Sequence, residues 1–115
     1  MTVEILRSAT SRARLAALAA AQFGDMVKVV VDVRRRVIAI GGELHSDEEA
    51  ALMEDGSAQG DLWGINLYPA EQGDAWIEFD SMINVRPSQG NRSRSVEDGG
   101  RQDVIRQIVT ALVEE

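Results

Sequence analysis

Cysteine is absent from this chain of 115 residues, and histidine occurs only once, as His45. Without cysteine the chain has no disulfide framework and no thiolate ligand for zinc. A dedicated zinc site takes three or four protein ligands, mostly Cys or His, and a single histidine does not supply them. We therefore expect no structural metal of this kind and no cofactor.

Long apolar runs are missing as well. No stretch approaches the roughly 18 apolar residues of a transmembrane helix, so we expect no contact with the membrane interior. The alanine-rich stretch from Leu15 to Ala21 follows Arg12 and Arg14, which is the order found in a secretory signal. It holds few large apolar residues and fits an amphipathic helix better. The expectation is a cytoplasmic protein with a single globular domain, residues 1–115.

Lysine is nearly absent, because eleven of the twelve basic residues are arginine and the one lysine is Lys28. Acids are in excess, and the net charge is −7. Sequence-independent binding of nucleic acid depends mostly on neutralising phosphates, so this charge argues against it. The charges are also segregated: residues 43–80 hold eleven acids and no lysine or arginine, while residues 81–96 hold three arginines and no acid. A local site for an anion therefore stays open.

Three helices are expected, at about residues 10–22, 47–55 and 100–113. Thr10 or Ser11 can cap the first. Ser46 and Glu49 have the spacing of a capping box, which predicts that the second helix begins at residue 47. Asp98 can cap the third, in which an apolar stripe recurs at helical spacing (Val104, Ile105, Ile108, Val109 and Leu112).

Strand patterns lie between these helices. Alternating valines predict a strand at residues 26–33, which turns through three arginines into a second strand at Val37–Ile40. Residues 61–68 predict a third strand, in which Gly64 suggests a bulge or a close backbone approach. The run from Ala75 to Arg86 predicts a long strand that ends at Pro87 and buries its odd positions, Ile77, Phe79, Ile83 and Val85. Residues 2–6 are either a short strand or a lead-in to the first helix. The pattern predicts an α+β fold with two hairpins in a mostly antiparallel sheet of four to five strands, packed with three helices.

The loop after Pro87 is the main candidate site. It carries Arg86, Gln89, Asn91 and Arg92 around Gly90, and such a density of donors suits a phosphate or a carboxylate. The alternative is an ion-pair network with acids elsewhere. In particular, Glu54 and Asp55 oppose the dipole at the end of the second helix, so we expect an arginine such as Arg86 or Arg92 to pair with them.

Two further residues are candidate neighbours of that site. His45 stands among carboxylates at the start of a helix, where it can act as a general base or as one ligand of a magnesium or manganese site; the alternative is a residue that simply precedes the helix. Trp63 can stack a ring or belong to the core. If the loop around Gly90 lies over Ser46, then His45 and the arginines line one concave site.

The motifs GGELH (residues 41–45), DLWGINLYP (61–69) and INVRPSQGNRS (83–93) resemble a family of small prokaryotic proteins that is catalogued only as a domain of unknown function. The resemblance covers nearly the whole chain from Phe23 onward. It implies a compact cytosolic protein without an assigned activity, substrate or cofactor, and it transfers no catalytic residue.

Three hypotheses for function follow. The first is a non-enzymatic binding or interaction protein with an anion site in the loop from Pro87 to Ser95. The second is a metal-dependent hydrolase or nuclease that uses His45, Glu43 and neighbouring acids. The third is a structural homodimer joined through an exposed edge strand such as Val37–Ile40. The question of enzyme activity stays open, and the lack of a recognisable catalytic set favours the first hypothesis.

Overall fold

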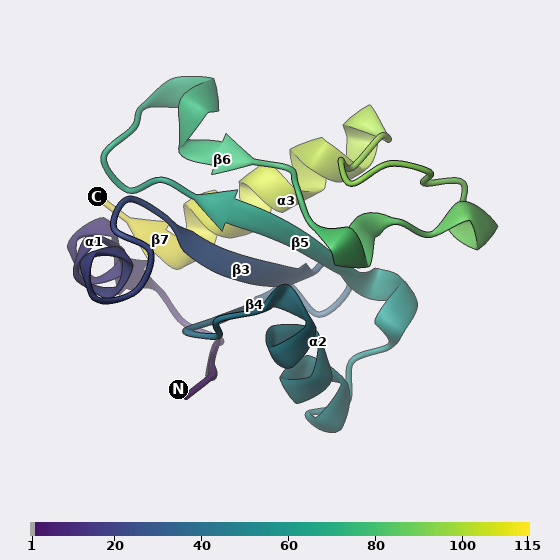
Figure 1. Cartoon of the computed structure of the whole chain (residues 1–115), viewed down its shortest axis with the longest axis horizontal. Helices are drawn as coiled ribbons and strands as arrows, with labels where there is room; N and C mark the ends of the chain where they lie inside the picture. The colour runs from purple at the N-terminus through teal and green to yellow at the C-terminus, as the bar shows by residue number, and fades with distance from the viewer. Residues whose placement is uncertain (1) are drawn as a thin grey trace.

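The computed structural model describes residues 2–115, and its centre is a five-stranded antiparallel sheet in the order β1-β4-β3-β5-β6 (Figure 1). These strands are β1 (Glu4–Leu6), β4 (Val37–Ile40), β3 (Val27–Asp32), β5 (Leu62–Leu67) and β6 (Ile77–Glu78). A second, two-stranded parallel sheet pairs β2 (Thr10–Ser11) with β7 (Val113–Glu114). The predicted α+β class is confirmed.

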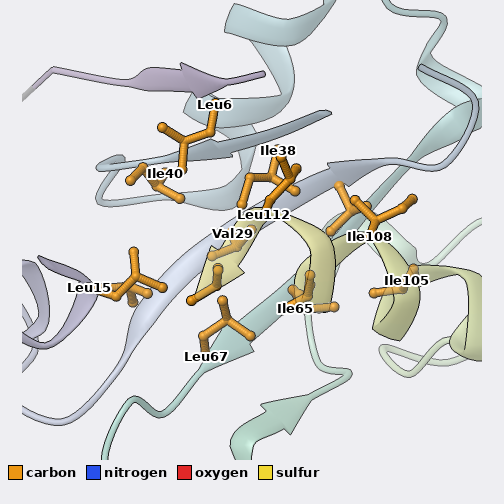
Figure 2. Close-up of a cluster of buried hydrophobic side chains, with 14 of the residues drawn as sticks. Leu6, Leu15, Val29, Ile38, Ile40, Ile65, Leu67, Ile105, Ile108 and Leu112 are labelled. Atoms are coloured by element: carbon orange, nitrogen blue, oxygen red, sulfur yellow. The ribbon is translucent and has the colours of Figure 1, made fainter. Parts of the chain in front are cut away.

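Helices cover both faces of the large sheet. On one face, α1 (Arg12–Ala21) and α3 (Gly99–Leu112) pack on the odd-numbered valines of β3, and Figure 2 shows their leucine and isoleucine side chains converging there. On the other face, α2 (His45–Glu54) covers a smaller cluster around Val30, Ala39, Leu52 and Leu62. Within residues 2–115, no helix is both long and apolar enough to cross a membrane. The sheet is therefore the middle of three layers.

All three predicted helices are present, but the start of α2 differs from the prediction. Ser11 and Asp98 cap α1 and α3 as expected, each accepting a backbone N–H three residues further on. The capping box at Ser46 is wrong: α2 begins at His45, and its N-cap, Leu44, offers no side-chain hydrogen bond. One turn into the helix, the Glu48 carboxyl accepts the N–H of Gly42 at 3.0 Å and so ties down the chain before the helix.

The first predicted hairpin is confirmed, since β3 pairs with β4. Its turn contains no glycine and is held instead by Asp32, whose Oδ1 accepts the N–H groups of Arg34 and Arg35 at 2.9 and 2.8 Å. Arg36 takes the left-handed conformation with φ 58°. Arg36 thus adopts the conformation that glycine usually supplies in hairpins, and the hydrogen bonds of the buried Asp32 hold the turn in place.

The long strand predicted from Ala75 to Arg86 is wrong. Only Ile77–Glu78 pairs with β5, and the chain then forms the short 3₁₀ helices η3 (Met82–Asn84) and η4 (Pro87–Gln89). Ser81 caps η3 by accepting the N–H of Ile83, so the alternation is lost there. Asn84, at an even position, is buried whereas Val85 is exposed, which contradicts the predicted odd-numbered face.

The strand Val37–Ile40 is not an edge strand, because β1 pairs with it along its outer side. The outer strands of the sheet are β1 and β6. The homodimer predicted through β4 is therefore wrong in its geometry, while a dimer through another surface stays a prediction.

Candidate functional site

A pocket of about 460 Å³ opens on the α2 face of the sheet. The start of α2, strands β3, β5 and β6, and the η3 segment surround it. Its lining is mixed in charge and rich in hydrogen-bonding groups (Lys28, His45, Ser46, Asn66, Tyr68, Glu78, Asp80, Ser81 and Arg94), with Leu44 and Met82 among its apolar residues. The volume lies within the range of known small-molecule sites, and the lining is more polar than is usual for them.

The floor of the pocket is a row of three side chains on neighbouring strands. Lys28 of β3 lies directly opposite Asn66 of β5, and Asn66 lies opposite Glu78 of β6. Directly opposed residues of antiparallel strands project from the same face. With strands about 4.8 Å apart, the row spans roughly 10 Å between the first and last backbones. A cation and an anion thus stand at its two ends.

Hydrogen bonds organise the negative end of the row. Asn66 Nδ2 donates to Glu78 Oε1 at 2.8 Å and to the Asp80 carbonyl at 3.2 Å, and the Tyr68 hydroxyl also donates to Glu78. Burial and the nearby charge of Glu78 raise the pKa of Tyr68. Arg94 pairs with Asp80 at 2.7 Å. Asp80 thus has a charged partner, whereas Glu78 has only neutral donors.

The positive end has no such partners. No acid among residues 2–115 forms an ion pair with Lys28, whose Nζ lies 5.2 Å from the centre of the Phe23 ring. The start of α2 lies beside it without a side-chain cap. A helix N-terminus carries about half a positive charge, so this end of the pocket attracts anions.

His45 lies between the two ends and is almost fully buried. Its Nε2 is 2.8 Å from the carbonyl oxygen of Ile65, which fixes the proton on this nitrogen because a carbonyl only accepts. Burial lowers the pKa of His45, and Lys28 lowers it further, against opposing effects of Ile65, Asp80 and Asn66. The ring is therefore neutral near pH 7, and its Nδ1 is available as an acceptor.

The metal-dependent hypothesis needs several acidic ligands around His45. Asp80 and Glu78 do share its pocket, but Glu43 lines a separate hollow next to Phe23. Nowhere in residues 2–115 do three or more His, Asp or Glu side chains cluster in a way that could hold a metal ion. The geometry does not support that hypothesis, and it stays an untested prediction.

The residues of the predicted anion loop bind to the protein's own backbone. Arg86 donates to the carbonyls of Ile83, Gln59 and Leu62, and its guanidinium stacks on Trp63 at 4.5 Å. Gln89 donates to the carbonyl of Gly60 at 3.1 Å. Asn91 is buried, and its Nδ2 donates to the carbonyls of residues 84, 93 and 95 while its Oδ1 accepts the N–H of residue 97. These donors hold the loop in shape.

The loop and the pocket meet through only one of the arginines. Arg94 lines the pocket together with His45, whereas Arg86 and Arg92 do not. Arg92 is exposed. Trp63 lies fully buried on the opposite face of β5, between Arg86 and Arg101. An anion site formed by Arg86, Gln89, Asn91 and Arg92 stays a prediction, and the structure does not join it to His45.

The partner predicted for the end of α2 is also wrong. Asp55 pairs with Arg7 at 2.7 Å and with Arg35 at 2.6 Å, rather than with Arg86 or Arg92. Hydrogen bonds from Arg7 and then Arg35 lower the pKa of Asp55. Arg86 instead lies 3.7 Å from Glu49, in the first half of α2. The acidic end of α2 is thus paired with arginines as expected, but these are Arg7 and Arg35.

Glu48 is fully buried in α2, and it is expected to make the stability of the fold depend on pH. Burial raises its pKa to about 9, so it is protonated at neutral pH. Its unfolded-state pKa lies near 4.5, so its stabilising contribution is complete below pH 4.5 and declines as the pH rises toward 9. Glu48→Gln mimics the protonated form and is expected to raise the free energy of unfolding at pH 8 by about 1–3 kcal/mol.

Urea unfolding between pH 5 and pH 9 measures this effect. The variant is expected to lose the decline in stability that the natural chain shows over that range. Glu43→Gln, at an exposed position before the same helix, is the matched control and is expected to keep the decline. An equal decline in both variants would show that Glu48 is ionised in the folded protein.

Sequence reasoning missed the row formed by Lys28, Asn66 and Glu78. One signal was available, since Lys28 is the only lysine and stands at an even position of the clearest strand. The strand register that brings Asn66 and Glu78 beside it is not readable from local patterns. The fold and the pocket together define a three-layer α+β protein with a polar pocket that has oppositely charged ends.

The comparison with known families identifies the chain more closely. Residues 4–112 match DUF5674, which is described as a protein of unknown function, and the chain belongs to this family. No curated protein and no solved structure gives a significant match. The resemblance expected from the motifs is thus confirmed, and the function has to be argued from the site.

Proposed function

We propose that this protein binds a small organic anion in the pocket beside the start of α2. The main observation is the side chain of Lys28, which has no ion-pair partner in the described chain and lines the pocket beside the uncapped start of α2. A carboxylate or phosphate placed there would accept hydrogen bonds from both. This keeps the anion-binding prediction but moves it from the arginine loop to the pocket.

Binding rather than catalysis is the role that we propose. The Nε2–H of His45 is used by the Ile65 carbonyl, and the Ser81 hydroxyl accepts the N–H of Ile83. Neither group is paired with the other as a nucleophile and base would be. The cytoplasmic location remains part of this proposal.

Replacing Lys28 by glutamine is expected to weaken the binding of simple anions at least tenfold, because a charge-assisted hydrogen bond is lost. Ligand-observed NMR with acetate, pyruvate and inorganic phosphate measures the affinities. Arg92→Gln is the control, since it removes one positive charge from the predicted loop site and leaves the pocket intact. The opposite result, with loss in Arg92→Gln alone, would place the anion at the loop.

A further inference from the structure

We infer that the ligand is a zwitterion, an amino acid with an aliphatic side chain, whose ammonium group lies toward Glu78 while its carboxylate lies toward Lys28. This inference rests on the proposed anion site and extends it to the whole row on the pocket floor. Three independent features of the pocket support it.

The first feature is an unpaired acceptor on Asn66, a side chain that lines the pocket and is only 5% exposed. Its Nδ2 donates to Glu78 and to the Asp80 carbonyl, and because both partners only accept, the orientation of the amide is fixed. Its Oδ1 is enclosed and has no partner at hydrogen-bonding distance, and the Asn66 amide lies close enough to the His45 ring to raise that ring's pKa. Because buried acceptors are rarely left unpaired, this oxygen favours a cationic donor rather than an anion in the adjoining part of the pocket.

The second feature is the charge distribution. Asp80 and Arg94 neutralise each other, which leaves Lys28 and Glu78 as the uncompensated charges at opposite ends of the row. A simple anion would be attracted by Lys28 and by the helix N-terminus, but it would also be repelled by Glu78. A zwitterion that lies over Asn66 complements the charges at both ends, because its ammonium donates to Glu78 while its carboxylate accepts from Lys28.

The third feature is apolar. Leu44 and Met82, which are 54% and 67% exposed, line the pocket from the loop before α2 and from η3. Large apolar side chains this exposed are favourable places for an apolar part of a ligand. The pocket volume of about 460 Å³ has room for a compact branched side chain between them.

A pair of ligands with one carbon skeleton tests the inference. Leucine and 4-methylpentanoate differ only in the amino group, and we expect isothermal titration to show at least tenfold tighter binding of leucine. Glu78→Gln keeps the acceptor for Asn66 and Tyr68 but removes the charge. In this variant the advantage of leucine is expected to fall to less than threefold while the affinity for 4-methylpentanoate is kept or improved.

The controls separate this inference from the proposed function. Glu54→Gln, at the exposed end of α2, is expected to keep the full preference for leucine. Equal binding of the two ligands to the natural protein would overturn the zwitterion while leaving an anion site. A preference for leucine that survives in Glu78→Gln would overturn the placement of the ammonium. If neither ligand nor any simple anion binds, both proposals fail.

Discussion

Asn84→Ala is expected to lower the free energy of unfolding by about 4 kcal/mol, because the buried N–H and carbonyl of Gly64 lose their hydrogen bonds at once. Where β6 stops, the Asn84 side chain takes the place of the missing strand. Its Oδ1 accepts the N–H of Gly64 at 2.8 Å, and its Nδ2 donates to the carbonyls of Gly64 and Arg94 at 2.9 and 3.0 Å. Alanine leaves the N–H and the carbonyl of Gly64 without these bonds at a fully buried position, while the Arg94 carbonyl still accepts the N–H of Ser81 at 3.0 Å.

Urea denaturation, followed by circular dichroism, measures this loss. Gln89→Ala is the matched control, since it removes two side-chain hydrogen bonds, with the Gly60 carbonyl and with Arg86, from the exposed part of the same segment. It is expected to cost less than about 1 kcal/mol. A similar small loss for Asn84→Ala would mean that this side chain does not act as a substitute strand.

Gly64→Ala is expected to destabilise the fold by about 3 kcal/mol, because the added methyl group has no room. A Cβ built on Gly64 would lie 2.5 Å from Cβ of Ser81 and 3.2 Å from Cδ2 of His45. The absent side chain thus creates the space in which His45 and Ser81 stand over the sheet. We expect the substitution to disturb the pocket as well as stability, and the shift of the His45 ring protons in NMR spectra to report it.

A double substitution makes this prediction specific. Ser81→Gly removes the atoms that the new methyl group meets, so it is expected to recover at least 1 kcal/mol in the Gly64→Ala background while destabilising the natural chain. Gly60→Ala is the control, since its Cβ would meet only the Gln89 amide at 3.5 Å or more. Additive effects of Gly64→Ala and Ser81→Gly would contradict the steric argument.

Much of the fold could be predicted because local patterns and tertiary packing agree. The alternating valines of β3 and the apolar stripe of α3 correctly indicate which face of each element is buried in the core. The long strand after Ala75 failed because its alternation is equally compatible with a short strand followed by 3₁₀ turns. The capping of η3 by Ser81 and the bonds of Asn84 to Gly64 decide between them, and neither contact is visible in the sequence.

The site was harder to predict, and the reason is physical. Counting donors in the loop from Arg86 to Arg94 suggested an anion site, but a donor is available only if the backbone leaves it free. Arg86 and Gln89 donate hydrogen bonds to backbone carbonyls of residues 59–62, and these donors are therefore already occupied. Conversely, Lys28 and Glu78 come together only through the pairing of three strands. Long-range register therefore decides which polar side chains are available to a ligand.

The central claim is that the ligand binds over Asn66 rather than at the arginine loop, and a two-dimensional ¹H–¹⁵N NMR titration of the natural protein with leucine tests it most directly. The account predicts that the largest shifts belong to the backbone amides of His45 and Ser46 and to the side-chain amide of Asn66, while Gly90 and Arg92 stay unchanged. Shifts concentrated at Gly90, Asn91 and Arg92, with His45 and Asn66 unaffected, would contradict it.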